Sequence, residues 1–201
     1  MLYARLYSVI FKRHLWIIGI VLLAVLGMAA CSGVSPAFGQ YYQGRTLVIN
    51  LVNIDRVPEL RYTTISDDGT PRHSRIVASE SEMELVVVHL KVENHTATSA
   101  FLNVDRTAAE LRDLVSNKYF PIDVSDRVQD SDEPPTRNGK SARIFGLQPD
   151  GTFPDNKGFI RGPVELQKGM GIEGWIIFEA PKGTKFREFK WRAGDSLTIT
   201  F

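Results

Sequence analysis

The chain has 201 residues, of which 23% are charged, and its formal net charge is +1. A nearly balanced charge without clustered Lys and Arg argues against a nucleic-acid-binding protein, and a single cysteine excludes a framework of disulfides. Without its first 30 residues, the chain is still long enough for one domain with a single hydrophobic core.

The N-terminal residues have the layout of a secretory signal. The first 14 residues include three basic residues and no acid, and residues 15–30 are then uncharged, mostly apolar and closed by two alanines. A basic end, an apolar centre and a small-residue cleavage site are typical of a signal peptide. We therefore predict that residues 1–30 are a signal peptide, helical in its apolar part, whose removal changes the formal charge from +1 to −2.

The only cysteine, Cys31, directly follows this segment. The stretch from Gly27 to Gly33 (GMAACSG) resembles the lipobox of bacterial lipoproteins, in which an aliphatic residue and two small residues precede the cysteine; here Met28 replaces the usual Leu. The resemblance implies a diacylglyceryl group on Cys31 and an extracytoplasmic location in a bacterial cell envelope, with the membrane as partner. Two acyl chains suffice for stable anchoring.

Two other interpretations of this region remain open. Residues 1–30 could be kept as a signal anchor, although sixteen apolar residues are short of the ~20 that a spanning helix needs. Cys31 could also be an ordinary buried thiol. Ser32 resembles the residue that directs lipoproteins to an outer membrane, but the sequence does not decide between an inner and an outer membrane.

Residues 31–44 are predicted to be a flexible tether, because small residues, Pro36 and three glycines interrupt any apolar period. Its aromatic residues Phe38, Tyr41 and Tyr42 would either lie near the membrane surface or pack on the first strand. The globular domain is then expected over 45–201.

The sequence after the tether predicts strands. Residues 83–94 (MELVVVHLKVEN) alternate between an apolar face and a face that becomes polar, and Leu197, Ile199 and Phe201 form one face of a terminal strand. Residues 171–179 are apolar on both faces, which is typical of a central strand. Further strands are predicted at 47–54, 61–65, 100–104, 160–166 and 186–191. About eight strands without long helical patterns favour an all-β protein with a two-sheet sandwich.

Residues 107–124 permit two local structures. Thr107 and Glu110 satisfy a capping box, and apolar residues then follow at helical spacing to Asn117. Alternatively, residues 110–114 and 118–124 form the two arms of a β-hairpin with its turn at 115–117.

A long insertion is predicted at 126–163, which contains five prolines and five glycines. A loop of over 30 residues is uncommon in a compact domain and is usually functional or disordered. Its apolar residues are Ile144, Phe145, Leu147, Phe153, Phe159 and Ile160, and we expect its second half to pack back onto the sandwich.

Three segments together resemble an uncharacterised family of bacterial lipoproteins and secreted proteins. They are LVVVHLKVEN, which ends at Asn94, AELRDLVSNKYFPIDV, and the closing block from residue 166 to 201 with a Gly- and Trp-containing strand at Gly171–Pro181. The resemblance implies an immunoglobulin-like sandwich and favours the hairpin at 110–124. It implies no reaction and no catalytic residues.

No set of residues matches an established catalytic or metal site. The acidic segment 123–132 lacks the central glycine and terminal glutamate of a calcium loop, and residues 139–141 (GKS) lack the first glycine of a phosphate loop. His73, His89 and His95 have neither the spacing of zinc ligands nor a Gly-x-Ser-x-Gly turn. We predict no enzyme activity, metal or cofactor.

Two functions are compatible with these features. The first is a lipid-anchored, non-enzymatic envelope protein whose sandwich binds another protein or an envelope component through loops or a sheet edge. The second is a small-molecule or ion-binding accessory protein that uses the 126–163 insertion.

Overall fold

The computed structural model describes residues 35–65, 68–133 and 158–201. These residues contain strands, turns and loops and no helix, and residues 36–201 form a compact unit. The chain is therefore all-β over these ranges, as predicted. The predicted signal helix and Cys31 lie outside the described residues.

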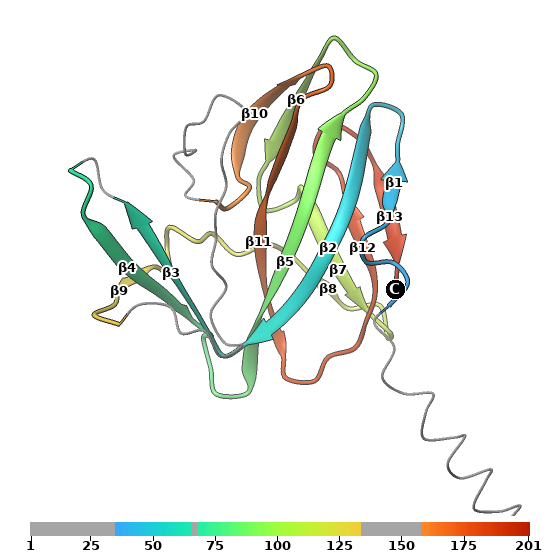
Figure 1. The fold of residues 1–201 in the computed structure, drawn as a ribbon. Helices are drawn as coiled ribbons and strands as arrows, with labels where there is room; N and C mark the ends of the chain where they lie inside the picture. Colours follow the sequence, from blue (N-terminus) through green and yellow to red (C-terminus); the bar gives the residue numbers. More distant parts are fainter. Residues whose placement is uncertain (1–34, 66–67, 134–157) are drawn as a thin grey trace, which may run out of the picture. The chain divides into compact units, whose positions relative to one another are not determined.

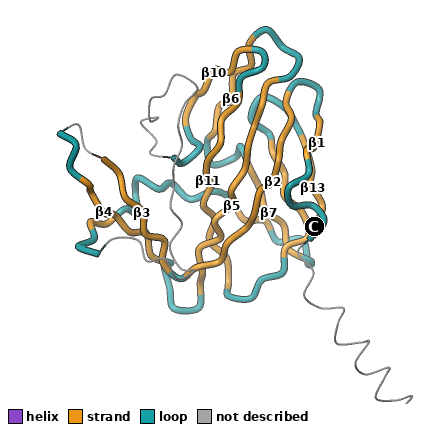
Figure 2. Tube along the Cα trace, in the orientation of Figure 1, coloured by secondary structure: helices purple, strands orange, loops and turns teal. Residues whose placement is uncertain are grey.

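Apart from the long connection between residues 130 and 162, the strands follow one another in the chain with mostly short connections (Figures 1 and 2). They are β1 (Tyr41–Gln43), β2 (Leu47–Val57), β3 (Glu59–Ile65), β4 (Pro71–Val77), β5 (Met83–Asn94), β6 (Ser99–Val104), β7 (Ala109–Asp113), β8 (Lys118–Tyr119), β9 (Gln129–Asp130), β10 (Gly162–Gln167), β11 (Gly171–Pro181), β12 (Phe186–Trp191) and β13 (Leu197–Thr200).

The strands pair into two facing layers and one additional small sheet. One layer has the order β1-β2-β5-β11; the other consists of β13-β12-β7-β8 and the pair β10-β6. The third sheet, β3-β4-β9, diverges to one side (Figure 1). Every paired strand runs antiparallel to its neighbour. This arrangement is a β-sandwich.

A main core fills the space between the two layers. Val86, Val88, Leu90 and Val92 of β5 are fully buried in it, as their alternation predicts. The facing layer contributes large side chains, including Leu102, Leu111, Phe189 and Trp191. The buried indole of Trp191 donates a hydrogen bond from Nε1 to the carbonyl oxygen of Ala193 at 2.7 Å, so that its one polar atom is satisfied.

An outer core lies on the other face of β5 and β11, beneath the β3–β4 hairpin. It contains Leu60, Tyr62, Ile76, Leu85, Val87, Phe159, Trp175 and Ile177. The ring of Phe159 contacts Tyr62 edge-to-face, with ring centroids 5.2 Å apart. This second core explains why β5 is apolar on both faces at its start and polar on one face at its end.

The structure supports the hairpin in the 107–124 segment and not the helix. β7 and β8 pair antiparallel, with Leu111 opposite Tyr119. Glu110 does not act as a capping-box residue; it is 1% exposed and accepts hydrogen bonds from Arg112 and Arg192. Burial alone would raise the pKa of Glu110, but the two guanidinium groups outweigh it and hold that pKa below its usual range.

Two predictions need correction, and one strand was not predicted. The second half of the predicted tether belongs to the domain, because β1 pairs with β2 and the rings of Phe38 and Tyr42 pack against the main core. The strand at 171–179 is buried on both faces in its middle, but among the described strands it is the last of its sheet and pairs with β5 alone. Strand β4 was not predicted, because its basic residues and histidine obscure the apolar alternation.

Candidate functional site

The outer edge of β11 is covered by two short segments instead of by another strand. The amide of Ile160 donates a hydrogen bond to the carbonyl oxygen of Trp175 at 3.0 Å. The amide of Trp175 donates one to the carbonyl oxygen of Gly158 at 3.1 Å. The amide of Ile122 donates to the carbonyl oxygen of Ile177 at 2.8 Å. These bonds satisfy part of an edge that would otherwise be open to pairing.

Gly174 makes this close approach possible. A Cβ atom at this position would lie 2.4 Å from the carbonyl oxygen of Gly158, which is closer than nonbonded atoms tolerate. The glycine that precedes Trp175 therefore has a packing reason that the sequence does not reveal: it admits the backbone of residues 158–160 to the β11 edge.

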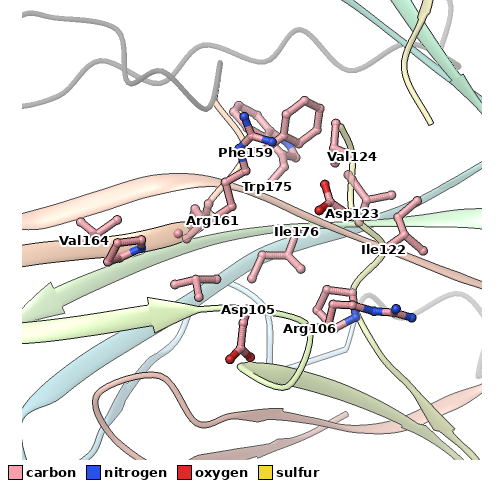
Figure 3. A pocket seen from close by; sticks show the side chains of 16 residues that line it. Asp105, Arg106, Ile122, Asp123, Val124, Phe159, Arg161, Val164, Trp175 and Ile176 are labelled. Carbon is pink, nitrogen blue, oxygen red and sulfur yellow. The ribbon is translucent and has the colours of Figure 1, made fainter. Parts of the chain in front are cut away.

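A cavity of about 500 Å³ lies beside this edge (Figure 3). Most of its lining is apolar and includes Val104, Ile122, Phe159, Val164, Trp175 and Ile176. The lining combines Ile176 of the main core with Trp175 and Phe159 of the outer core. The cavity thus marks the place where the outer core ends and the space between the two layers opens to solvent. Its volume lies within the range of small-ligand sites.

Two arginines and two aspartates supply the charges of the cavity. Arg161 donates to the hydroxyl of Ser125, whereas Arg106 makes no hydrogen bond or ion pair within the described residues. Figure 3 shows the two arginines on different sides of the cavity. Neither guanidinium pairs with a carboxylate in the part of the chain that the structure describes.

The aspartates of the cavity are engaged by their own loops. Asp105 accepts hydrogen bonds from the amide and the hydroxyl of Thr107, both at 2.7 Å, and these bonds lower the pKa of Asp105. Asp123 accepts one from the amide of Ser125 at 2.9 Å. The lining is therefore an apolar surface with two arginines that can donate hydrogen bonds to a ligand. The formal charges of the two arginines and the two aspartates cancel.

The three histidines of the domain lie in separate surroundings. His89 is on the outward face of β5, as predicted, but it is not simply solvated: its ring stacks on Trp175 at a centroid distance of 4.5 Å, and Nε2 lies 2.9 Å from Glu173 Oε1. Burial lowers the pKa of His89, and Glu173 opposes that effect. His73 contacts Thr63, and His95 contacts Glu93.

The acidic residues of 123–132 do not converge. Asp123 closes its own turn, and Asp130 lies in β9, 3.3 Å from Arg72. Within residues 35–65, 68–133 and 158–201, no group of three or more His, Cys, Asp or Glu side chains is placed to hold a metal ion. The Gly139-Lys140-Ser141 segment lies outside these ranges.

The insertion at 126–163 is described only at its two ends. Phe159 and Ile160 are 4% and 6% exposed and belong to the two cores, which confirms that its last residues pack onto the sandwich. The other predicted apolar residues, Ile144 to Phe153, lie outside the described residues. Arg106 and Arg161 were missed at the sequence level, since no periodic pattern marks loop residues that meet only after folding.

No helix among the described residues is long and apolar enough to cross a membrane. The signal segment and Cys31 are not among those residues, so the lipid site stays a prediction of the sequence.

No protein-family model and no curated protein matches the chain. Several solved structures are similar to the chain at a low level. The yjhA protein of Bacillus subtilis matches with a TM-score of 0.48 and 14% identity over 81% of this chain and 97% of its own. The candidate lipoprotein ycdA of Bacillus subtilis matches with a TM-score of 0.42 and 13% identity over 80% of this chain, which spans only 38% of ycdA.

An uncharacterised β-sandwich protein of Clostridium difficile matches with a TM-score of 0.41 and 11% identity, over 82% of this chain and 91% of its own. Likenesses at this level assign neither a family nor a function to the chain.

Proposed function

We propose that this chain is a bacterial envelope lipoprotein with an immunoglobulin-like sandwich, which binds an envelope component without transforming it. The cavity beside β11 carries the proposal, because it combines a volume of about 500 Å³ and an apolar lining with two arginines that lack carboxylate partners among the described residues. Binding sites commonly have this composition: a mostly apolar concave surface with a few polar groups that orient the ligand.

Anchoring through Cys31 is the second part of the proposal, and it rests on the signal-like segment and the lipobox resemblance. In a bacterial host, the wild-type protein should lose residues 1–30, gain the mass of acyl chains and sediment with membranes. Cys31→Ala should abolish the added mass. A full-length, unmodified chain that sediments with membranes would instead identify residues 1–30 as a signal anchor.

The cavity is tested by photo-crosslinking in intact cells. A photoreactive phenylalanine analogue at Val164, which lines the cavity, should capture a discrete adduct. The same analogue at Thr198, which is exposed on β13, is the matched control and should not. The double variant Arg106→Gln/Arg161→Gln should reduce the adduct about tenfold while the domain keeps its melting temperature, because both side chains are exposed.

Identical adducts at the two positions, or an adduct that the arginine substitutions leave unchanged, would refute the cavity as the binding site. The identity of the adduct also shows whether the cavity binds an envelope component, such as a protein, or a small ligand.

A small-molecule accessory protein is the second candidate, and the size of the cavity favours it. Ligand binding to the folded state raises the melting temperature, since it stabilises that state by RT ln(1 + [L]/Kd). Stabilisation of residues 36–201 by a small organic anion, lost in the Arg106→Gln/Arg161→Gln variant, would support this candidate. A screen of such anions and of calcium without any shift would count against it.

A further inference from the structure

Two adjacent apolar side chains project from the turn between β7 and β8. Leu114 and Val115 are 60% and 77% exposed, although residues of this type usually contribute to a core. Single exposed apolar residues are common and need no explanation. A consecutive pair at the tip of a hairpin is a different feature, because neither side chain can be covered by its own strand.

The turn is held rigidly by Asp113. One carboxylate oxygen, Oδ1, accepts hydrogen bonds from the amides of Val115 at 3.0 Å and Asn117 at 2.8 Å. The other, Oδ2, accepts from Asn117 Nδ2 at 2.8 Å and from the hydroxyl of Tyr119 at 3.1 Å.

Ser116, within the same turn, has a φ of 72°, a conformation that is unfavourable for a residue with a Cβ atom. The fold therefore holds the apolar pair in a defined outward position at a conformational cost.

Basic residues surround the tip. The amide of Leu114 donates to the carbonyl oxygen of Lys185 at 3.2 Å, Lys118 lies opposite Arg112 in the β7–β8 pair, and Arg187 Nη2 approaches the Ser116 hydroxyl at 3.5 Å. Within the described ranges, the two lysines form no ion pair. Arg187 also lies 3.6 Å from Glu188 Oε1, and the carboxylate of Asp113 is occupied by the turn. The tip thus combines a projecting apolar pair with cations beside it.

The chain enters the folded unit at the same end. Phe38 stacks on Phe201 with a centroid distance of 5.7 Å, and the amide of Phe201 donates to the carbonyl oxygen of Arg187 at 2.9 Å. Arg187 in turn contacts Ser116 at the tip. Figure 1 marks the C-terminus at this end of the unit. Because Cys31 is seven residues before Phe38, an extended chain places it within about 25 Å of that ring.

We propose that Leu114 and Val115 insert into the headgroup region of an anionic membrane while Lys118, Lys185 and Arg187 contact lipid phosphates. The position of the tip relative to a lipid on Cys31 rests on the proposed function, whereas the apolar pair and its cations do not. Apolar burial and electrostatic attraction together determine interfacial binding of this kind. The domain would then hold a fixed orientation on the membrane rather than hang from a tether.

The experiment uses residues 36–201, which form a compact unit and lack Cys31. This unit should sediment with vesicles that contain phosphatidylglycerol and phosphatidylcholine, and not with phosphatidylcholine alone. Leu114→Ser/Val115→Ser should weaken binding about tenfold. Lys118→Gln/Lys185→Gln should remove the preference for the anionic vesicles, and salt should weaken the wild-type interaction.

Phe101→Ser is the matched control, because Phe101 is 69% exposed and lies on β6, outside the sheet that carries the tip. It should bind the vesicles like the wild type. Melting temperatures of all variants report whether each one folds, and the exposed positions should change them little.

Wild-type residues 36–201 that fail to sediment with anionic vesicles, or equal binding by the Leu114→Ser/Val115→Ser variant, would overturn the inference. Capture of a protein but no lipid by a photoreactive group at position 115 would do so as well. Since this unit lacks Cys31, such results would leave the lipid-anchor proposal intact. If residues 36–201 bind the vesicles but Cys31 is unmodified in cells, the membrane contact of the tip would stand and the lipid-anchor proposal would fail.

Discussion

The main core and the outer core share the same two strands but differ in how they are closed. In the main core, β5 and β11 face a complete second layer, and Val86, Val88 and Phe178 are fully buried. In the outer core, Leu85 and Val87 face no complete layer among the described residues; the β3–β4 hairpin, residues 122–124 and Phe159 pack there instead.

The polar end of β5 lies beyond that cover. His89, Lys91 and Glu93 occupy the face that Leu85 and Val87 begin. The outer face of β5 is covered over only part of its length, and the candidate cavity lies where this cover ends. The main core therefore maintains the fold, while the outer core positions the candidate site.

Truncation of a large ring in each core tests this division and should have the largest effect. Phe178→Ala removes a ring that lies edge-to-face with Phe189, with ring centroids 6.5 Å apart. This truncation should destabilise the domain by about 3–5 kcal/mol. Phe159→Ala should cost about 2 kcal/mol, because the adjacent cavity lets the surroundings relax.

Urea denaturation measures both losses. The truncation at 159 should also abolish crosslinking at the cavity, whereas folded Phe178→Ala protein should retain it. Equal losses of stability would show that the two cores form one cooperative unit without the proposed difference.

Gly174→Ala addresses the segment that covers the β11 edge and should have an intermediate effect. The added methyl group would meet the carbonyl oxygen of Gly158 at 2.4 Å, so the segment 158–160 must move away from β11 at a cost of about 1–3 kcal/mol. Hydrogen exchange at the amides of Ile160 and Trp175 should accelerate while that of β12 stays slow. Unchanged protection at Ile160 would show that the edge accommodates the methyl group.

His89 gives the smallest predicted effect, which appears only on acidification. Burial against Trp175 lowers the pKa of His89 in the folded state, so between that pKa and the ordinary value of about 6.5 the unfolded chain binds more protons than the folded chain. Stability should therefore fall as the pH decreases through this window. His89→Gln should flatten that dependence in urea denaturation measured at several pH values. A wild type and variant with parallel pH profiles would contradict the assignment.

Local alternation was sufficient to predict strands that have one face in the main core. The bounds 83–94 and 186–191 agree with β5 and β12, because each inward side chain meets the same opposite layer. The β4 strand escaped prediction since only two of its residues, Ser74 and Ile76, are buried. The edge position of β11 could not be inferred either, since residues 121–122 and 158–160 cover its edge in place of a strand.

The sequence alone determines the all-β class and the signal-like start with Cys31, because both follow from short, contiguous patterns of polarity. Tertiary structure decided what the patterns left open. Residues 109–119 form a hairpin, in which Glu110 is buried between Arg112 and Arg192, the latter 82 residues away. Arg106 and Arg161 line one cavity only because strand pairing brings their loops together, and the physical interactions that do so are not local to either loop.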